Sequence, residues 1–170
     1  MTRTRSAQET TGETILIEET GLGPFQLKVT TGSSTFMLDE PIGAGGLGSG
    51  PNPYDLLSAA LGASTATTIR AYATAKRWPL ERIHVRVSHQ RPGVRGRATF
   101  VRQILLVGRL DEPQRIKLLA MADRCPIQLS IGTGPEIKTT LLNELSSRND
   151  LAVTHGDHMR DVLQICQSEN

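Results

Sequence analysis

The chain has 170 residues, with 19 Lys and Arg against 17 Asp and Glu, so its formal net charge at neutral pH is +2. A charge this small does not predict a nucleic-acid-binding surface, and the length suits one domain with one core. The longest uncharged run in a periodic segment, 56–69, is too short and too rich in small residues to predict a membrane span. Residues 1–9 lack the apolar stretch of a secretory signal, and two cysteines make no disulfide framework, so the cytoplasm is the expected compartment.

The first third of the chain predicts a disordered arm, a small sheet and a linker. Residues 1–12 contain no large apolar side chain and are expected to form the arm. Three short runs rich in β-branched and aromatic residues then predict an antiparallel meander: 14–18, 25–30 and 34–38. Segment 42–50 contains five glycines, but no Lys followed by Ser or Thr comes after it to bind a phosphate. A flexible linker that lets the next helix cross the sheet is the preferred interpretation.

A long helix after the linker has strong boundary signals. Asn52 is a good N-cap, Pro53 suits the first turn, and Asp55 completes a pattern like a capping box. A Trp-Pro pair should end the helix at about Arg77. Because no charge occurs in 56–69, this helix must be covered on nearly all sides, and its small residues favour close packing of helices. One protomer offers too little cover, so the sequence predicts a homodimer in which two copies of the helix pack together.

The rest of the chain predicts a hairpin and further separate elements. The basic segment 91–97 contains Pro and Gly, and a turn between two strands is preferred there over a polyanion site. A short helical turn is expected after Cys125-Pro126. The other predicted elements are, in order, two strands, a helix, a strand and a helix: 80–90, 98–110, 111–124, 136–142 and 158–167. Because strands and helices are segregated along the chain, the fold class is predicted to be α+β.

Two segments carry a family resemblance: Gly50-Pro51-Asn52-Pro53-Tyr54-Asp55-Leu56-Leu57 at the start of the long helix, and Ala122-Asp123-Arg124-Cys125-Pro126. Together they resemble the family of osmotically inducible protein C (OsmC) and the organic hydroperoxide resistance proteins, over residues 14–143. The resemblance implies an OsmC-like domain at 13–143, with antiparallel sheets packed around long central helices in an intertwined homodimer. Residues 144–170 then form a C-terminal extension. No cofactor, metal, nucleic acid or membrane is expected as a partner.

The resemblance also implies a chemistry that this chain only partly retains. In the family, a cysteine at the position of Ser64 attacks an organic hydroperoxide, and the resulting sulfenic acid is resolved by the cysteine at the position of Cys125. A serine hydroxyl neither ionises near neutrality nor forms a sulfenic acid. The family also uses a carboxylate near the helix start and an arginine on an early strand. In this chain Tyr54 occupies the position where the organic hydroperoxide resistance branch has Glu, and Asp55 follows it. No Arg occurs in 6–69, so the early-strand arginine is absent.

The two cysteines leave alternatives open. Cys125 could sit at a helix start, where backbone N–H groups favour a reactive thiolate, or it could be buried and inert. Without a partner at position 64, it could work only with an external thiol, such as a dithiol reductant, or with Cys166. Cys166 lies among apolar residues of the terminal helix, and a structural role is preferred for it.

Ser64 and the histidines are also candidates for hydrolytic or metal chemistry. Residues 62–66 loosely echo the Gly-x-Ser-x-Gly elbow of hydrolases, but that elbow needs a strand-to-helix turn, and Ser64 lies three turns inside a helix. Its hydroxyl is expected to bond a backbone carbonyl one turn back. His155 and His158 are three apart in the tail, but without a third ligand nearby they are expected to be solvated. His84 and His89 fall on opposite faces of a strand.

The sequence supports two functional hypotheses. One is an OsmC-type protein related to thiol-dependent reduction of organic hydroperoxides, with Ser64, Cys125 and Asp55 at catalytic positions, Tyr54 contacting the substrate, and weak or no peroxidase activity. The other is a dimeric binding module in which the same four residues line a cleft at the subunit boundary for an apolar small molecule.

Overall fold

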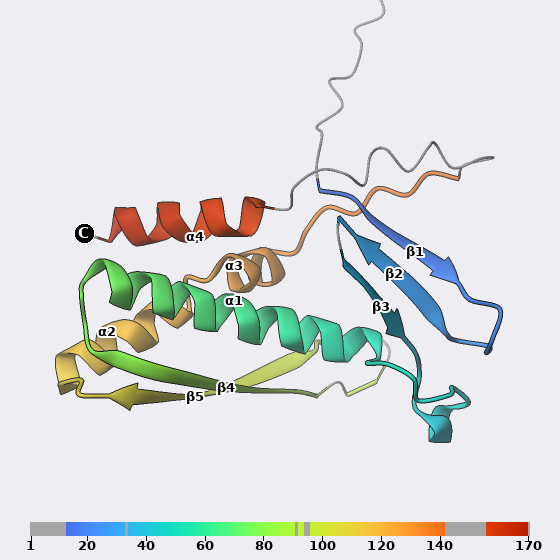
Figure 1. The fold of residues 1–170 in the computed structure, drawn as a ribbon, viewed down its shortest axis with the longest axis horizontal. Helices are drawn as coiled ribbons and strands as arrows, with labels where there is room; N and C mark the ends of the chain where they lie inside the picture. The colour runs from blue at the N-terminus through green and yellow to red at the C-terminus, as the bar shows by residue number, and fades with distance from the viewer. Residues whose placement is uncertain (1–12, 33, 91, 94–95, 142–155, 170) are drawn as a thin grey trace, which may run out of the picture.

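The computed structural model describes residues 13–32, 34–90, 92–93, 96–141 and 156–169, and Figure 1 shows how its elements are arranged. The expected arm, 1–12, lies outside these residues, as does 142–155. The α+β class predicted from the sequence is confirmed. In chain order the described elements are β1 (Ile15–Glu19), β2 (Leu27–Thr31), β3 (Ser34–Leu38), the short helix η1 (Ile42–Ala44), α1 (Pro53–Ala75), β4 (Leu80–Gln90), β5 (Thr99–Gly108), α2 (Glu112–Ala122), α3 (Pro126–Thr133) and α4 (Asp157–Ser168). No described helix is both long and apolar enough to cross a bilayer.

The predicted N-terminal meander is confirmed as a three-stranded antiparallel sheet in the order β1-β2-β3. Val29 on the central strand and Leu38 at the end of β3 are its buried side chains. The register pairs Val29 with Ile17 of β1 and with Phe36 of β3. The sheet lies beyond the N-terminal end of α1 (Figure 1).

The glycine-rich segment is not the flexible linker that the sequence predicts, because a buried carboxylate holds it in place. Asp39 accepts hydrogen bonds from the backbone N–H of Leu47 at 3.0 Å, from that of Ser49 at 3.1 Å, and from the Ser49 hydroxyl at 2.8 Å. Burial acts to raise the pKa of Asp39, but these hydrogen bonds outweigh it and lower that pKa. Gly50 is required at the end of the loop, since a Cβ there would collide with the Met37 carbonyl.

Helix α1 begins as predicted and ends two residues early. The Asn52 side chain accepts the Tyr54 and Asp55 backbone N–H groups, and Asp55 accepts the Asn52 N–H at 3.0 Å, which completes the capping box. At the other end Arg77 adopts a left-handed backbone with φ +56°, and the Trp78 N–H bonds the Ala73 carbonyl. The turn therefore starts at Lys76, before the Trp-Pro pair is reached.

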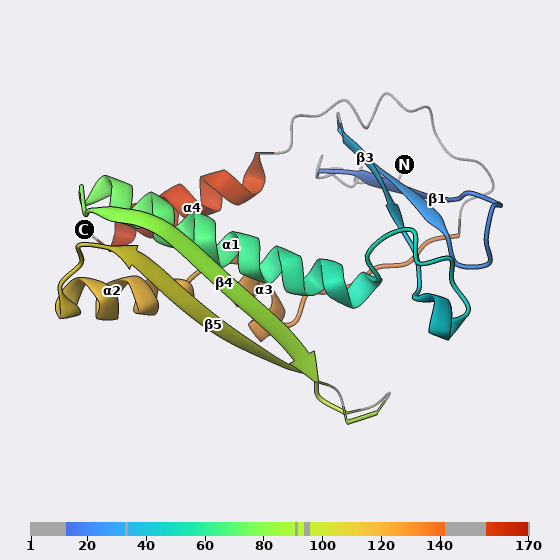
Figure 2. The same cartoon turned by 60° about the horizontal axis from the view of Figure 1, so that its bottom comes forward.

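The predicted hairpin is confirmed, and it packs along α1. β4 and β5 pair antiparallel from Gln90–Thr99 to Leu80–Gly108, and Figure 2 shows the hairpin running along the helix. Alternate β4 side chains are half-buried on the face toward α1, among them Val85 and Val87. Gly62 allows the close approach, because a Cβ there would already lie 3.3 Å from a Val87 methyl carbon.

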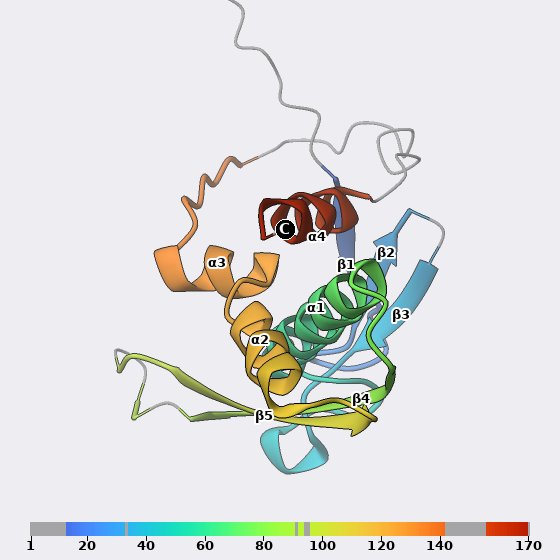
Figure 3. The ribbon, with the colours of Figure 1, turned by 90° about the vertical axis from the view of Figure 1, so that its left-hand side faces the viewer.

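The main core surrounds the C-terminal half of α1, which is enclosed by other elements of its own chain (Figure 3). Helices α2 and α4 and the hairpin all contribute. Its buried members are Ile69, Tyr72, Ala73, Leu80, Leu110, Leu118, Met121, Ala122, Val162 and Cys166. The terminal helix predicted at 158–167 is thus confirmed, and it supplies part of the cover that one protomer was expected to lack. The N-terminal half of α1 stays more open, with Leu57 45% exposed.

The prediction of a strand at 136–142 is wrong for residues 136–141, the part that the structure describes. Residues 134–141 form no helix or strand, and Ile137 and Leu141 are 83% and 94% exposed. Alternating β-prone residues make a strand only where another strand's backbone lies alongside to pair with them. No described strand of this chain pairs with the segment.

Candidate functional site

Ser64 lies on the face of α1 that meets α3 and α4, and it is 2% exposed. Its Oγ lies 2.9 Å from His158 Nε2 of α4 and accepts the Ile127 N–H of α3 at 3.4 Å. The bond to a carbonyl one turn back, expected for Ser64, is instead made by its neighbours: Thr65 bonds the Leu61 carbonyl, and Thr68 bonds the carbonyl of Ser64 itself. The Ser64 hydroxyl is therefore directed at other elements rather than at its own helix.

Cys125 is the N-cap of α3, as the first alternative expects, and it is also fully buried, as the second expects, so its reactivity stays a prediction. Its Sγ lies 3.6 Å from Thr65 Oγ1 and makes no capping hydrogen bond. Ile127, which contacts Ser64, is two residues further along. The structure thus brings together the two positions, 61 residues apart in sequence, that the resemblance pairs.

Arg102 of β5 is a central residue of this cluster that sequence reasoning missed. Its Nη1 donates to Thr65 Oγ1 at 2.8 Å and to the Ala122 carbonyl at 2.9 Å, and it lies 3.9 Å from Cys125 Sγ. Its Nη2 pairs with Asp123 at 2.7 Å. A signal was present, because Arg102 falls on the alternating half-buried face of β5, where only apolar side chains are expected.

His158 is the second residue that was missed. It was expected to be solvated, but it is half-buried against Ser64. The spacing of four between His158, Val162 and Cys166 places all three on one face of α4, and the last two are buried. That spacing was the available signal. Burial raises the pKa of the Cys166 thiol, whose Sγ lies 3.9 Å from the Thr68 carbonyl, and this setting fits the preferred structural role.

Tyr54 and Asp55 lie at the far end of α1 from this cluster. Asp55 is an exposed capping residue, and Tyr54 stacks on His89 of β4 with ring centroids 4.8 Å apart. At 1.5 Å per residue, they are about 14 Å along the helix axis from Ser64. One protomer does not bring them to Ser64, and their roles in catalysis and substrate binding remain predictions. Within the described part of the chain, no three His, Cys, Asp or Glu side chains are grouped to hold a metal ion.

Comparison with known proteins identifies the family. The sequence model of the family described as OsmC-like protein matches residues 46–140, which is more than half of the chain. The chain belongs to the OsmC-like family. Ser64, Arg102 and Cys125 lie inside the matched segment, whereas α4 with His158 lies beyond it. No curated protein sequence matches the chain significantly.

Solved structures share the fold at low sequence identity. A protein from Psychrobacter arcticus, described as an osmotic stress induced and detoxification response protein, is 20% identical to this chain. The two structures superpose with a TM-score of 0.62, and the match covers 70% of this chain and 88% of that one. The organic hydroperoxide resistance protein OsmC from Legionella pneumophila is 23% identical with a TM-score of 0.55, over 71% and 88%. An OsmC-like protein from Mycoplasma pneumoniae is 15% identical with a TM-score of 0.60, over 71% and 87%.

Proposed function

We propose that this chain forms a cytoplasmic OsmC-like homodimer related to the thiol-dependent reduction of organic hydroperoxides, with weak or no peroxidase activity of its own. The observation that carries the proposal is the position of Ser64. Its hydroxyl meets the start of α3 beside Cys125, where the family resemblance places two cooperating thiols.

The chemistry explains why a serine at this position matters. In hydroperoxide reduction, a thiolate attacks the O–O bond, the alcohol leaves, and the sulfur becomes a sulfenic acid. A second thiol then attacks that sulfur, so a disulfide forms and water is released. Ser64 cannot take the first step. Cys125 is 0% exposed, so it is poorly placed to meet a hydroperoxide or a dithiol reductant alone.

The surroundings of position 64 would suit a thiol. His158 Nε2 lies at hydrogen-bonding distance from the Ser64 hydroxyl, and the N-terminal end of α3 faces it. Both a nearby imidazole and a helix N-terminus favour a thiolate. Arg102 supplies a cation beside Cys125, although it comes from β5 and not from the early strand where the family pattern has it.

The test is reduction of cumene hydroperoxide with a dithiol reductant by the unchanged chain, Ser64→Cys and Ser64→Ala. We expect turnover in Ser64→Cys at least about 100-fold above the other two, which is the low end of what a positioned catalytic group contributes. Adding Cys125→Ala to Ser64→Cys should leave sulfenic acid formation intact but stop the formation of an internal disulfide. Equal turnover in the unchanged chain, or silence in Ser64→Cys with its fold intact, would contradict the proposal.

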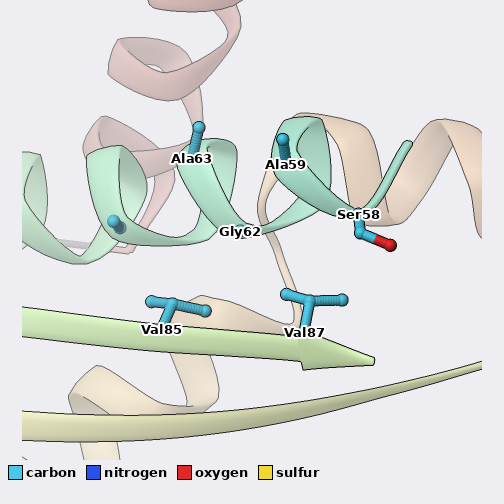
Figure 4. A pocket seen from close by; sticks show the side chains of 7 residues that line it. Ser58, Ala59, Gly62, Ala63, Val85 and Val87 are labelled. Atoms are coloured by element: carbon cyan, nitrogen blue, oxygen red, sulfur yellow. The ribbon is translucent and has the colours of Figure 1, made fainter. Parts of the chain in front are cut away.

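The homodimer is supported by apolar surface that one chain leaves uncovered. Leu57, Ala59 and Ala63 are exposed on the N-terminal half of α1. A groove of about 330 Å³ between α1 and β4 lies beside them, lined by small residues that permit the close approach of another helix (Figure 4). Ile137 and Leu141 add exposed apolar side chains on a segment that pairs with no strand among the described residues.

A binding module for an apolar small molecule is the second candidate, at the groove between α1 and β4 rather than in the cleft of Tyr54, Asp55, Ser64 and Cys125 that the sequence predicts. The same groove is within the usual volume range of ligand sites, and Val85 and Val87 form its floor. The Ser58 hydroxyl oxygen at its edge is buried and has no hydrogen-bond partner among the described residues. Native mass spectrometry of the purified chain should then show a copurifying molecule of defined mass. Repeated preparations without one would count against this function.

A further inference from the structure

We propose that Ser64 and His158 form a nucleophile and general-base pair that accepts the acyl group of a short-chain carboxylic ester. The pair unites α1 with a helix beyond the family-matched segment. It uses the hydroxyl that makes peroxidase chemistry unavailable, so the inference does not depend on the proposed function.

The first support is the geometry of the pair. Ser64 Oγ and His158 Nε2 are 2.9 Å apart, within the 2.6–3.2 Å over which a base takes a proton from a nucleophile. Oγ already accepts the Ile127 N–H, so its own proton is available to donate to Nε2. The proposed proton transfer requires the imidazole tautomer protonated at Nδ1, in which Nε2 accepts the Ser64 hydroxyl proton.

The second support is a donor where negative charge would develop. Pro126 is the first residue of α3 and has no N–H, so the Ile127 N–H is the first donor of the helix, and it points at Ser64 Oγ. The Cys125 side chain makes no capping bond that would compete for these donors. When an ester carbonyl adds to Oγ, its oxygen forms close to the Ile127 N–H and to the positive end of the α3 dipole.

The reaction balances without a cofactor or an oxidant. Ser64 Oγ adds to the ester carbonyl carbon while its proton moves to His158 Nε2. The C–O bond to the leaving alcohol then breaks, and the imidazolium returns the proton to that alcohol. The acyl group remains on Ser64 as an ester, and water, deprotonated by the same imidazole, can release it as a carboxylic acid.

The surroundings restrict the substrate to small neutral esters. A cavity of about 370 Å³ lies between α3 and α4. Its lining includes Pro126, the residue before Ile127, and Asp161, one turn beyond His158, but neither Ser64 nor His158 itself. Leu129 and Ile165 also line it, and the Asp161 carboxylate disfavours anionic acyl chains there. Since Ser64 is 2% exposed, only a short acyl group reaches it.

The test uses p-nitrophenyl acetate with the full chain, followed by peptide mapping. We expect an initial burst of about one equivalent of p-nitrophenol per chain, and one acetyl group on the peptide that contains Ser64 in samples quenched after the burst. Ser64→Ala should abolish this acetylation. His158→Gln, which keeps a polar side chain of similar reach to hold α4, should slow it by about 100-fold or more. His84→Gln, which changes an exposed histidine of β4, is the matched control and should leave the rate unchanged.

Each other outcome overturns the inference. If acetyl groups map only to lysines or to Cys125, Ser64 is not the nucleophile. If His158→Gln acetylates Ser64 as fast as the unchanged chain, with its folded state verified by circular dichroism, His158 only secures α4. Failure here leaves the Ser64→Cys peroxidase result untouched, so the two proposals fail separately.

Discussion

At the scale of single residues, Arg102 links more of the site than any other side chain described above. Its guanidinium joins α1 through Thr65, the end of α2 through the Ala122 carbonyl, and the turn before α3 through Asp123. The side chain is 12% exposed, so most of these bonds are shielded from water. Arg suits this position because the N–H donors of its planar guanidinium reach several acceptors in fixed directions.

Removing Arg102 should therefore lower the free energy of unfolding. We expect Arg102→Ala to cost about 1–3 kcal/mol, because the Thr65 hydroxyl and the Ala122 carbonyl lose a buried donor. Arg102→Lys should recover only part of this, since one ammonium cannot reach all three partners. Urea denaturation followed by circular dichroism measures the change. Arg109→Ala, at an exposed position just after β5, is the control; a loss as large there would show that Arg102 has no special role.

At the scale of elements, α4 is attached to the domain at both ends. Near its start His158 meets Ser64, and at its end Glu169 pairs with Lys117 of α2 at 2.7 Å and with Arg124. Between them Val162 is fully buried against the core. The helix thus closes the cluster around Ser64 and Cys125, and its attachment is tied to ionised groups.

That attachment should depend on pH. The hydrogen bond from Lys117 lowers the pKa of Glu169, against the opposing effect of burial, and the same bond raises the pKa of Lys117. A lowered carboxyl pKa gives stability above the ordinary value of 4.5 that is lost as the pH falls through the folded value. A raised amine pKa gives stability below 10.5 that is lost as the pH rises through the folded value.

We expect hydrogen exchange of the α4 amides to be slowest between pH 4.5 and pH 10.5 and to accelerate as the pH drops below 4.5. The rates are compared after correction for the intrinsic pH dependence of exchange. Glu169→Gln should speed exchange in α4 at neutral pH and flatten its acid dependence, because the amide keeps the shape but not the charge. Glu81→Gln, at an exposed position of β4, serves as the control. An unchanged α4 in Glu169→Gln would mean that the apolar face alone holds the helix.

The elements also show where sequence reasoning succeeds. α1 was predictable because Asn52 and Asp55 form a local capping box, and α4 because its apolar side chains recur at helical spacing. The strand at 136–142 failed because pairing needs a second backbone, which no local pattern supplies. The loop at 42–50 failed because its order comes from Asp39, several residues away in sequence.

The site was predictable only where the family resemblance reached. Position 64 and Cys125 came from matching motifs. Arg102 and His158 lie 38 and 94 residues beyond Ser64 in the sequence. Arg102 reaches the neighbouring Thr65 and His158 reaches Ser64 only because β5 and α4 pack against α1. Side chains that meet through tertiary packing leave only weak local signals, such as one charge on an apolar strand face.

At the scale of the whole molecule, the cover of α1 is unequal. Its C-terminal half is enclosed by α2, α4 and the hairpin, whereas the half before Ser64 exposes Leu57, Ala59 and Ala63 beside the groove to β4. This half is also uncharged from Leu56 onward. An uncharged helix face left open to water is a usual mark of an interface.

We therefore expect the chain to be a dimer by light scattering, and Ala63→Arg to convert it to a folded monomer. A buried, unpaired guanidinium would cost the interface several kcal/mol, whereas the monomer keeps the same side chain in water. Ala75→Arg, an equal change at an exposed position on the same helix but at its enclosed end, should leave the dimer intact. A dimer that survives Ala63→Arg and is lost in Ala75→Arg would place the interface at the other end of α1. A monomer in the unchanged chain would mean that the open half of α1 is free for a ligand or another protein.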